Sequence, residues 1–154
     1  SAASDVYKRQ KQYIETYFER YPGIKDYMER VVRDSKAKGY VETLFHRRRE
    51  LPDINARNFN VRQFAERTAI NSPIQGSAAD ILKIAMINLD KALVEGKFKT
   101  KMLLQVHDEI ILEVPKDELE AIEKLVKETM ESAIELSVPL VADESAGQTW
   151  YEAK

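Results

Sequence analysis

The sequence predicts an α+β fold, because helix-like and strand-like hydrophobic patterns occupy different parts of the chain. In four stretches before residue 97, apolar residues recur every three or four positions, as they do on one face of a helix. Over residues 101–114 the period changes to two, and a strongly apolar run is interrupted by His107, Asp108 and Glu109. We therefore expect an antiparallel hairpin with these three polar residues between its strands.

The first half of the chain is predicted to be mainly helical. One helix covers residues 11–20 and ends at Tyr21-Pro22-Gly23, and a second runs from residue 24 to a C-terminal glycine, Gly39. Residues 40–54 then predict two short strands around a basic tip. Helical spacing returns over residues 60–70.

The second half should begin on a helix and end on a strand. We expect Pro73 to kink or restart the helix, which then continues to Gly96. After the hairpin, Asp117 is the expected N-cap of a helix over residues 117–136, with Glu120 as its capping-box partner. Residues 139–141 suggest a last short strand.

Composition excludes several classes of protein. The chain has 154 residues, no Cys and two His, which argues against a disulfide framework or a zinc site and fits a reducing cytoplasm. No apolar run reaches the ~18 residues of a membrane span, and no secretory signal is present. Net charge is −2, but residues 46–67 carry a balance of +3 and residues 108–154 one of −9.

The acidic pair in the hairpin suggests a metal site. At a hairpin tip, the side chains of Asp108 and Glu109 can both reach one site. Carboxylates on a rigid tip suit Mg²⁺, which takes one or two of them and leaves its other positions to water and phosphate oxygens. The alternative is a solvated turn that is acidic for local hydrogen bonding.

A second motif, ERTAINSPIQGSAAD at residues 66–80, suggests a nucleic-acid surface. Arg67, Asn71 and Gln75 recur every four residues and share one helical face if the kink at Pro73 is mild. Asn and Gln amides both donate and accept hydrogen bonds, which suits base edges in a minor groove. The alternative is helix packing through the small residues 76–79, with the polar residues solvated on the far side.

Together, the two motifs resemble the C-terminal part of family A DNA polymerases, the bacterial DNA polymerase I type. The resemblance rests on FAERTAINSPIQGSAADILKIAM followed by LLQVHDEIILEVP, and it extends over roughly residues 11–154. It also includes YFERYPGIKDYMERV, GYVETL, RRRELPDI and the closing tryptophan segment.

The resemblance implies a role for each motif residue. VHDE would be the third polymerase motif, with Asp108 and Glu109 as the catalytic carboxylates that bind Mg²⁺ and with His107 against the primer terminus. Arg67, Asn71 and Gln75 would contact the template–primer duplex on its minor-groove side and at its backbone, and Arg62 a phosphate. The implied reaction is two-metal nucleotidyl transfer from a deoxynucleoside triphosphate to a primer 3′ end.

The resemblance also implies that parts of the polymerase are missing. The second metal-binding Asp of the family's palm and the nucleotide-binding helix of its fingers are not in this sequence. We therefore expect residues 11–70 to be a partial fingers subdomain and residues 71–154 the C-terminal part of the palm. SAASDVYKRQ, residues 1–10, does not match the family. Within it, DVYKRQ at residues 5–10 is expected to be a translated sequencing adapter; the alternative is a divergent native helix start, and the codons of the source DNA would decide.

Two other classes of function remain as alternatives. A non-catalytic DNA-binding module would keep the duplex-contacting surface alone, and a helical scaffold protein would carry the acidic turn by coincidence. For the polymerase we expect a cytoplasmic, nucleoid-associated location and no membrane or obligate protein partner. The missing Asp-bearing strand in an upstream extension of the reading frame would favour the polymerase.

Overall fold

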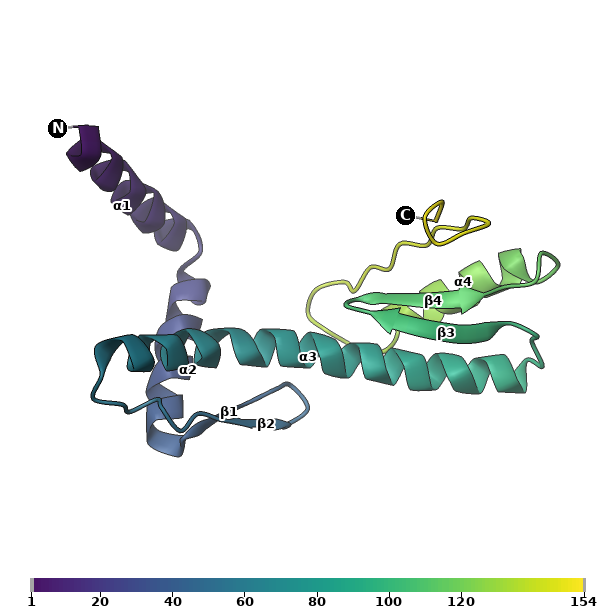
Figure 1. Ribbon diagram of the computed structural model, residues 1–154, viewed down its shortest axis with the longest axis horizontal. Coiled ribbons are helices and arrows are strands. Elements are labelled where there is room, and N and C mark those ends of the chain that lie inside the picture. The colour runs from purple at the N-terminus through teal and green to yellow at the C-terminus, as the bar shows by residue number, and fades with distance from the viewer. Residues whose placement is uncertain (1, 154) are drawn as a thin grey trace. The chain divides into compact units, whose positions relative to one another are not determined.

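The computed structural model describes residues 2–153, with the backbone alone over residues 2–6 (Figure 1). The elements in chain order are α1 (Ala2–Arg20), α2 (Pro22–Lys38), β1 (Tyr40–Glu42), β2 (Arg48–Glu50), α3 (Phe59–Glu95), β3 (Lys101–Val106), β4 (Glu109–Glu113) and α4 (Leu119–Glu131). The α+β class is thus confirmed. Contacts divide the chain into two units, Ser1–Gln75 and Gly76–Lys154. Among the described residues, no helix is long and apolar enough to cross a membrane.

The two N-terminal helices end close to the residues that the sequence predicted. Only Tyr21 separates α1 from α2, and Pro22 occupies the first turn of α2, where its missing N–H costs nothing. Gly39 ends α2 in the left-handed conformation, with φ of 83°, and donates its N–H to the Ser35 carbonyl at 2.7 Å. Glycine is favoured here because a Cβ would strain this backbone conformation.

The core of the first unit is small. Strands β1 and β2 form a two-stranded antiparallel hairpin, and Val41 of β1 is buried. It packs in a cluster with Leu51, Ile54, Ala65 and Ala69, the two alanines coming from α3. Because alanine has the smallest apolar side chain, the helix backbone can approach this cluster closely.

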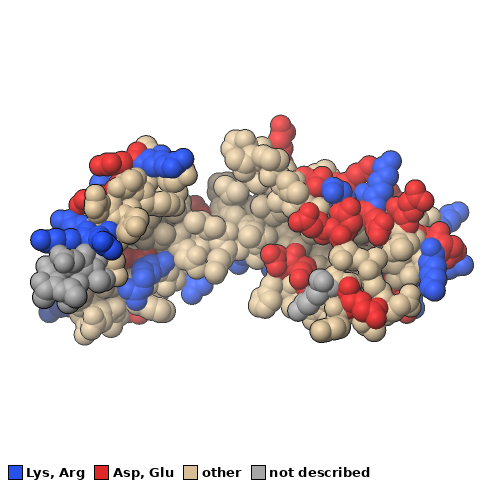
Figure 2. Space-filling view, turned by 90° about the horizontal axis from the view of Figure 1, so that it is seen from above, with Lys and Arg blue, Asp and Glu red and all other residues tan. Residues whose placement is uncertain are grey.

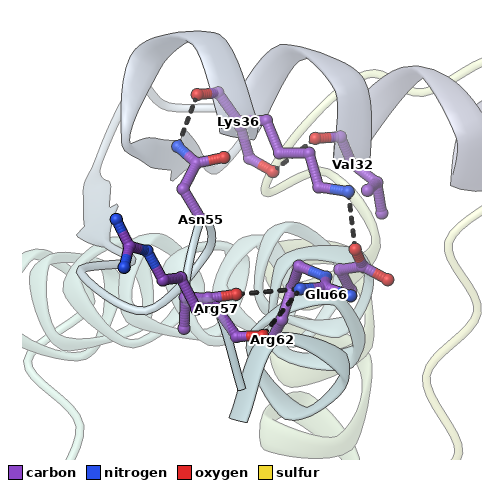
Figure 3. A network of polar contacts seen from close by, with 8 residues as sticks. Val32, Lys36, Asn55, Arg57, Arg62 and Glu66 are labelled. Atoms are coloured by element: carbon purple, nitrogen blue, oxygen red, sulfur yellow. Dashed lines mark hydrogen bonds and ion pairs between the residues drawn. The ribbon is translucent and has the colours of Figure 1, made fainter. Parts of the chain in front are cut away.

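Polar contacts tie α2 to the N-terminal part of α3. Lys36 Nζ lies 2.6 Å from a carboxylate oxygen of Glu66, and Asn55 donates from Nδ2 to the Lys36 carbonyl at 3.0 Å (Figure 3). Tyr27 donates its hydroxyl to the Ile70 carbonyl at 2.9 Å. Burial raises the pKa of the Tyr27 phenol, so this hydroxyl stays protonated and remains a donor at neutral pH.

The second unit is built on the predicted hairpin. Strands β3 and β4 pair from Lys101–Glu113 to Val106–Glu109, and the register shifts between Met102 and Leu104, so Leu103 is an extra residue on β3. The buried core consists of Leu89, Leu93 and Ile122, against which pack Phe98, Ile110, Leu112, Val114, Leu125 and Val126. One face of the hairpin therefore covers a core made with α3 and α4.

The other hairpin face is open. Leu103 and Leu104 are about half exposed, and among the described residues β3 and β4 pair only with each other. The alternation of Ile110, Leu112 and Val114 toward the core with Ile111 and Glu113 away from it matches the prediction. Among the described residues, neither outer strand edge therefore has a β-strand partner.

The start of α4 differs from the prediction. The N-cap is Glu118, not Asp117, and no side chain caps the helix. The Glu118 carboxylate instead accepts hydrogen bonds from the backbone N–H groups of Lys99 and Thr100, at 2.8 and 3.0 Å, and from the Thr100 hydroxyl at 2.7 Å. A tertiary contact has thus replaced the expected local capping box.

Of the two outcomes expected at Pro73, the restart is excluded, because α3 runs through this residue without a break, and the kink stays a prediction. Two further expectations need correction. The last helix ends at Glu131 rather than at residue 136. Residues 139–141 form no strand; the chain beyond them is held by a hydrogen bond from the Ala142 N–H to Glu131 at 3.1 Å. Gly96 does follow the last residue of α3, as predicted, and glycine suits this position because a Cβ would collide with the Phe98 ring.

Candidate functional site

The acidic hairpin turn is shorter than the sequence suggested. Val106 pairs with Glu109, so only His107 and Asp108 form the turn and Glu109 is the first residue of β4. His107 has φ of 55°, whereas Asp108 does not have a positive φ. This sign pattern is that of a type II′ turn, in which the first central residue is usually glycine. Expecting all three residues between the strands was therefore wrong for Glu109.

The turn presents its carboxylates to solvent. Asp108, Glu109 and His107 are all exposed, and Gln105 donates from Nε2 to the His107 carbonyl at 2.7 Å, which braces the turn. Because Ile110 faces the core, Glu109 points away from it, on the side of Ile111 and Glu113. Two adjacent carboxylates on a braced turn are hard oxygen donors of the kind that Mg²⁺ prefers.

The hairpin provides only part of a metal site. Within residues 2–153, no group of three or more His, Cys, Asp or Glu side chains is placed to hold a metal ion. A Mg²⁺ ion takes six ligands and commonly draws several of them from water and phosphate oxygens. Asp108 and Glu109 fit the protein's share of such a site, with the remaining donors coming from elsewhere.

In the first unit, α3 presents the predicted polar face. Ala65 and Ala69 are buried, and residues Arg67, Asn71 and Gln75 are exposed. With about 3.6 residues per turn, Arg67 and Asn71 lie on the side of the helix opposite the two alanines, and Gln75 lies at the edge of that side. The predicted shared face is therefore present. The small residues that pack on the other side of the helix here are Ala65 and Ala69, whereas the prediction considered residues 76–79.

The same face contains residues that the predicted motif omitted. Helical spacing adds to it the exposed residues Asn60, Gln63, Phe64 and Ile74. The Arg67 guanidinium lies 6.0 Å from the centre of the Phe64 ring, at the outer limit of a cation–π contact. Counting back from Arg67 in steps of three, four and seven would have found Phe64, Gln63 and Asn60. The face is thus rich in amides, with two exposed apolar side chains.

Arg62 lies on a different side of α3 and is already engaged. It is half-buried, and its Nη1 donates to the Ala56 carbonyl at 2.9 Å and to the Arg57 carbonyl at 3.5 Å (Figure 3). Asn58 caps the same helix end, because its Oδ1 accepts from the N–H groups of Asn60 and Val61. Arg62 therefore shapes the loop that enters α3, a role that the sequence did not reveal; its phosphate contact stays a prediction.

The two units carry opposite charge. The first has 15 Lys and Arg against 10 Asp and Glu, for +5, and the second has 9 against 16, for −7. On the face shown in Figure 2, acidic side chains gather over the part that contains β3, β4 and α4. The cationic and amide groups that suit phosphates and bases thus belong to one unit, and the carboxylates that suit a cation to the other.

Comparison with known proteins shows which family this chain resembles. The family model described as DNA polymerase family A matches residues 6–152. A DNA polymerase I of Streptococcus pneumoniae (serotype 4, strain TIGR4) is 77% identical over 147 residues, which are 96% of this chain and 17% of that protein. A DNA polymerase I of Bacillus subtilis is 56% identical over 142 residues, 92% of this chain and 16% of that protein.

A solved structure has the same fold. It is the POL domain of Pol1 from M. smegmatis, in complex with DNA primer-template and dNTP, with a TM-score of 0.92 and 44% identity over 95% of this chain and 26% of that one. The chain thus spans about a sixth of the length of the curated relatives it matches and a quarter of the chain in this structure. On the extent of the family match and these identities, the chain belongs to DNA polymerase family A.

Proposed function

We propose that this chain is the C-terminal portion of a DNA-directed DNA polymerase that extends a primer on a template strand. The observation that carries the proposal is the exposed pair of neighbouring carboxylates, Asp108 in the braced turn and Glu109 at the start of β4, in a chain of family A. In this reading, residues 11–70 belong to the fingers and residues 71–154 to the palm. The M. smegmatis neighbour, solved with primer-template and dNTP, supports these substrate classes.

The chain's own residues divide the work. Asp108 and Glu109 would hold Mg²⁺. When bound, this ion would neutralise negative charge on the oxygens that take part in a phosphoryl transfer. His107, at the first position of the turn, is suited to contact the primer terminus. Of the two carboxylates we assign Asp108 the larger role, with Glu109 as its less demanding neighbour.

The polar face of α3 is suited to the template–primer duplex. Arg67, Asn71 and Gln75 offer one guanidinium and two amides, which can accept from and donate to minor-groove edges. Minor-groove acceptors are nearly the same for every base pair, so these contacts test the shape of the pair without reading its sequence. Arg62 has donors beyond the Nη1 group that it uses internally and remains our candidate for a phosphate contact.

A second function, DNA binding without catalysis, is favoured for the isolated chain. Its described residues offer two adjacent carboxylates and no third metal ligand near them. Two ions that clamp both oxygens of the displacement need more protein donors than that. We therefore expect the 154-residue chain to bind primer–template DNA and not to extend it.

Primer extension tests both statements. The purified chain and the full-length polymerase that contains this sequence are compared on one labelled primer–template with Mg²⁺ and all four deoxynucleoside triphosphates. The proposal expects a gel shift with both proteins and extension with the full-length protein only. Extension by the short chain would overturn its assignment as inactive, and absence of any shift would overturn the assigned duplex surface.

A further inference from the structure

The tip of the β1–β2 hairpin is ordered by several internal hydrogen bonds, and the proposed function assigns it no role. We call residues 43–49 the basic tip. Thr43 and Arg47 are joined by a backbone hydrogen bond of 3.0 Å, and the Thr43 hydroxyl accepts from the N–H groups of Phe45 and Arg47, both at 3.2 Å. His46 also donates its N–H to the Thr43 carbonyl at 3.0 Å. Thr43 therefore holds the loop in one conformation.

His46 occupies a backbone position that normally takes glycine. Its φ is 60°, and three-residue hairpin loops commonly place glycine in this left-handed position. A side chain with a Cβ is strained there, and such strain is concentrated at functional sites. The His46 side chain is exposed, so no packing in a core accounts for its presence.

The charges of the hairpin are sorted by face. Residues directly opposite in an antiparallel pair share a face, so Glu42 lies with Arg48 and Val41 with Arg49. Arg48 is neutralised there: its Nε lies 3.0 Å from Glu42, and its guanidinium lies 4.4 Å from the centre of the Tyr40 ring. On the face of Val41 the paired strands have no acid, and the Arg49 guanidinium makes no hydrogen bond or ion pair with any described residue.

Flat and apolar side chains accompany these cations. Leu44 is 61% exposed and Phe45 37% exposed, beside the exposed His46. Exposed aromatic rings next to arginines are suited to a ligand that offers both anionic groups and flat apolar faces. An unpaired nucleic-acid strand offers phosphates and base faces together, whereas a duplex keeps its base faces stacked inside.

We propose that the basic tip binds an unpaired strand of nucleic acid, with Arg49 on its phosphates and with Phe45 and His46 against its bases. In a polymerase, the unpaired strand is the part of the template that extends beyond the primer–template duplex. The identity of the ligand therefore rests on the proposed function. It assigns the tip a ligand different from that of the α3 face, which meets paired bases.

Binding of three labelled DNA probes tests the proposal on the 154-residue chain: an oligothymidylate, a blunt duplex, and the same duplex with a 5′ overhang. The wild-type chain should bind the overhang probe more tightly than the blunt duplex. Arg49→Gln should weaken oligothymidylate binding and lower the slope of log affinity against log salt by about 0.7, the value of one phosphate contact on a single strand. Arg30→Gln, which removes an exposed cation of α2, is the matched control and should leave that slope unchanged.

The aromatic contribution is tested separately from charge. Phe45→Ala should weaken oligothymidylate binding about tenfold, the effect of losing one stacked base, whereas Phe45→Tyr should retain it. His46→Gly should raise the urea midpoint of the chain, because it relieves the backbone strain, and should still weaken oligothymidylate binding. If His46 only shaped the loop, a substitution that makes the chain more stable would not be expected to weaken binding.

The failures of the two proposals are distinguishable. If the wild-type chain binds neither duplex, the proposed function fails. If it binds the blunt duplex and the overhang probe equally, the basic tip has no such role. The same conclusion follows if the tip variants are folded and bind oligothymidylate as tightly as the wild-type chain. Competition by polyglutamate as effective as that by oligothymidylate would also overturn the proposal, since it would make the tip a site for acidic protein.

Discussion

The first unit of this chain is basic and packs on alanine, and the second is acidic and packs on leucine and isoleucine. In the first, the buried side of α3 is Ala65 and Ala69, so its outer side is free to carry Arg67 and the amides. In the second, Leu89, Leu93 and Ile122 support a hairpin whose turn carries Asp108. The difference teaches that each core is arranged to present one kind of polar group, cationic and amide groups in one unit and carboxylates in the other.

The largest expected effect is in the second unit. In the full-length polymerase, Asp108→Asn should lower primer extension by on the order of a thousandfold, because an amide keeps the shape but loses the charge that binds Mg²⁺. Affinity for primer–template should change little, since most of the DNA contacts that we propose lie in the first unit and Asp108 is not among them. Single-turnover extension and a gel shift measure the two quantities.

Two neighbouring carboxylates control that experiment. Glu113→Gln removes an exposed carboxylate from the other end of β4 and should leave extension near wild type. Glu109→Gln should give an intermediate loss. Equal losses from Asp108→Asn and Glu109→Gln would contradict the unequal roles assigned to them.

The two cores should differ in their response to a change of volume. Leu89→Ala empties a fully buried position and should lower the free energy of unfolding by about 2–5 kcal/mol. Ala69→Leu overfills an equally buried position and should cost about 1–3 kcal/mol. Urea unfolding of the chain measures both. A neutral Ala69→Leu would show that the first core has room that the structure does not suggest.

The α3 face should act on every template alike. Gln75→Ala in the full-length polymerase removes hydrogen bonds worth about 1 kcal/mol and should weaken extension several-fold. Extension on templates that differ only in the terminal base pair is the measurement. A loss confined to one base pair would refute a role in testing pair shape.

The smallest effect is a pH dependence in the second unit. Hydrogen bonds from the Lys99 N–H and Thr100 lower the pKa of the Glu118 carboxyl below its ordinary value. Such a group stabilises the fold above the ordinary glutamate pKa, and this contribution is lost as the pH falls through the lowered value. Glu118→Gln should therefore flatten the acid side of a plot of urea midpoint against pH. Glu120→Gln, an exposed neighbour, should not change that side of the plot.

The sequence was sufficient where the signal was local. Gly39, Pro22 and Gly96 each impose a backbone conformation or a steric limit that needs no distant partner, and the ends of α1, α2 and α3 follow them. The hairpin also follows from its period of two, and the face of Arg67, Asn71 and Gln75 from the helical period.

Distant contacts account for what the sequence could not predict. Asp117 is the better local cap, but Glu118 reaches Lys99 and Thr100, some eighteen residues away, and sets where α4 begins. Pro73 does not restart α3, which is continuous from Phe59 to Glu95. The internal engagement of Arg62 likewise depends on loop carbonyls that no local pattern indicates.

The extra residue at Leu103 determines where this hairpin can lose a residue without a change of register. The register passes from Met102–Leu112 to Leu104–Ile111, so Leu103 has no partner of its own. Losing the codon for Leu103 would leave every other cross-strand pair, and the position of Asp108 in the turn, as they are. Losing any other single codon between Leu104 and Ile110 would turn the remaining side chains to the opposite face. Natural variation in the length of this hairpin should therefore be concentrated at this one position.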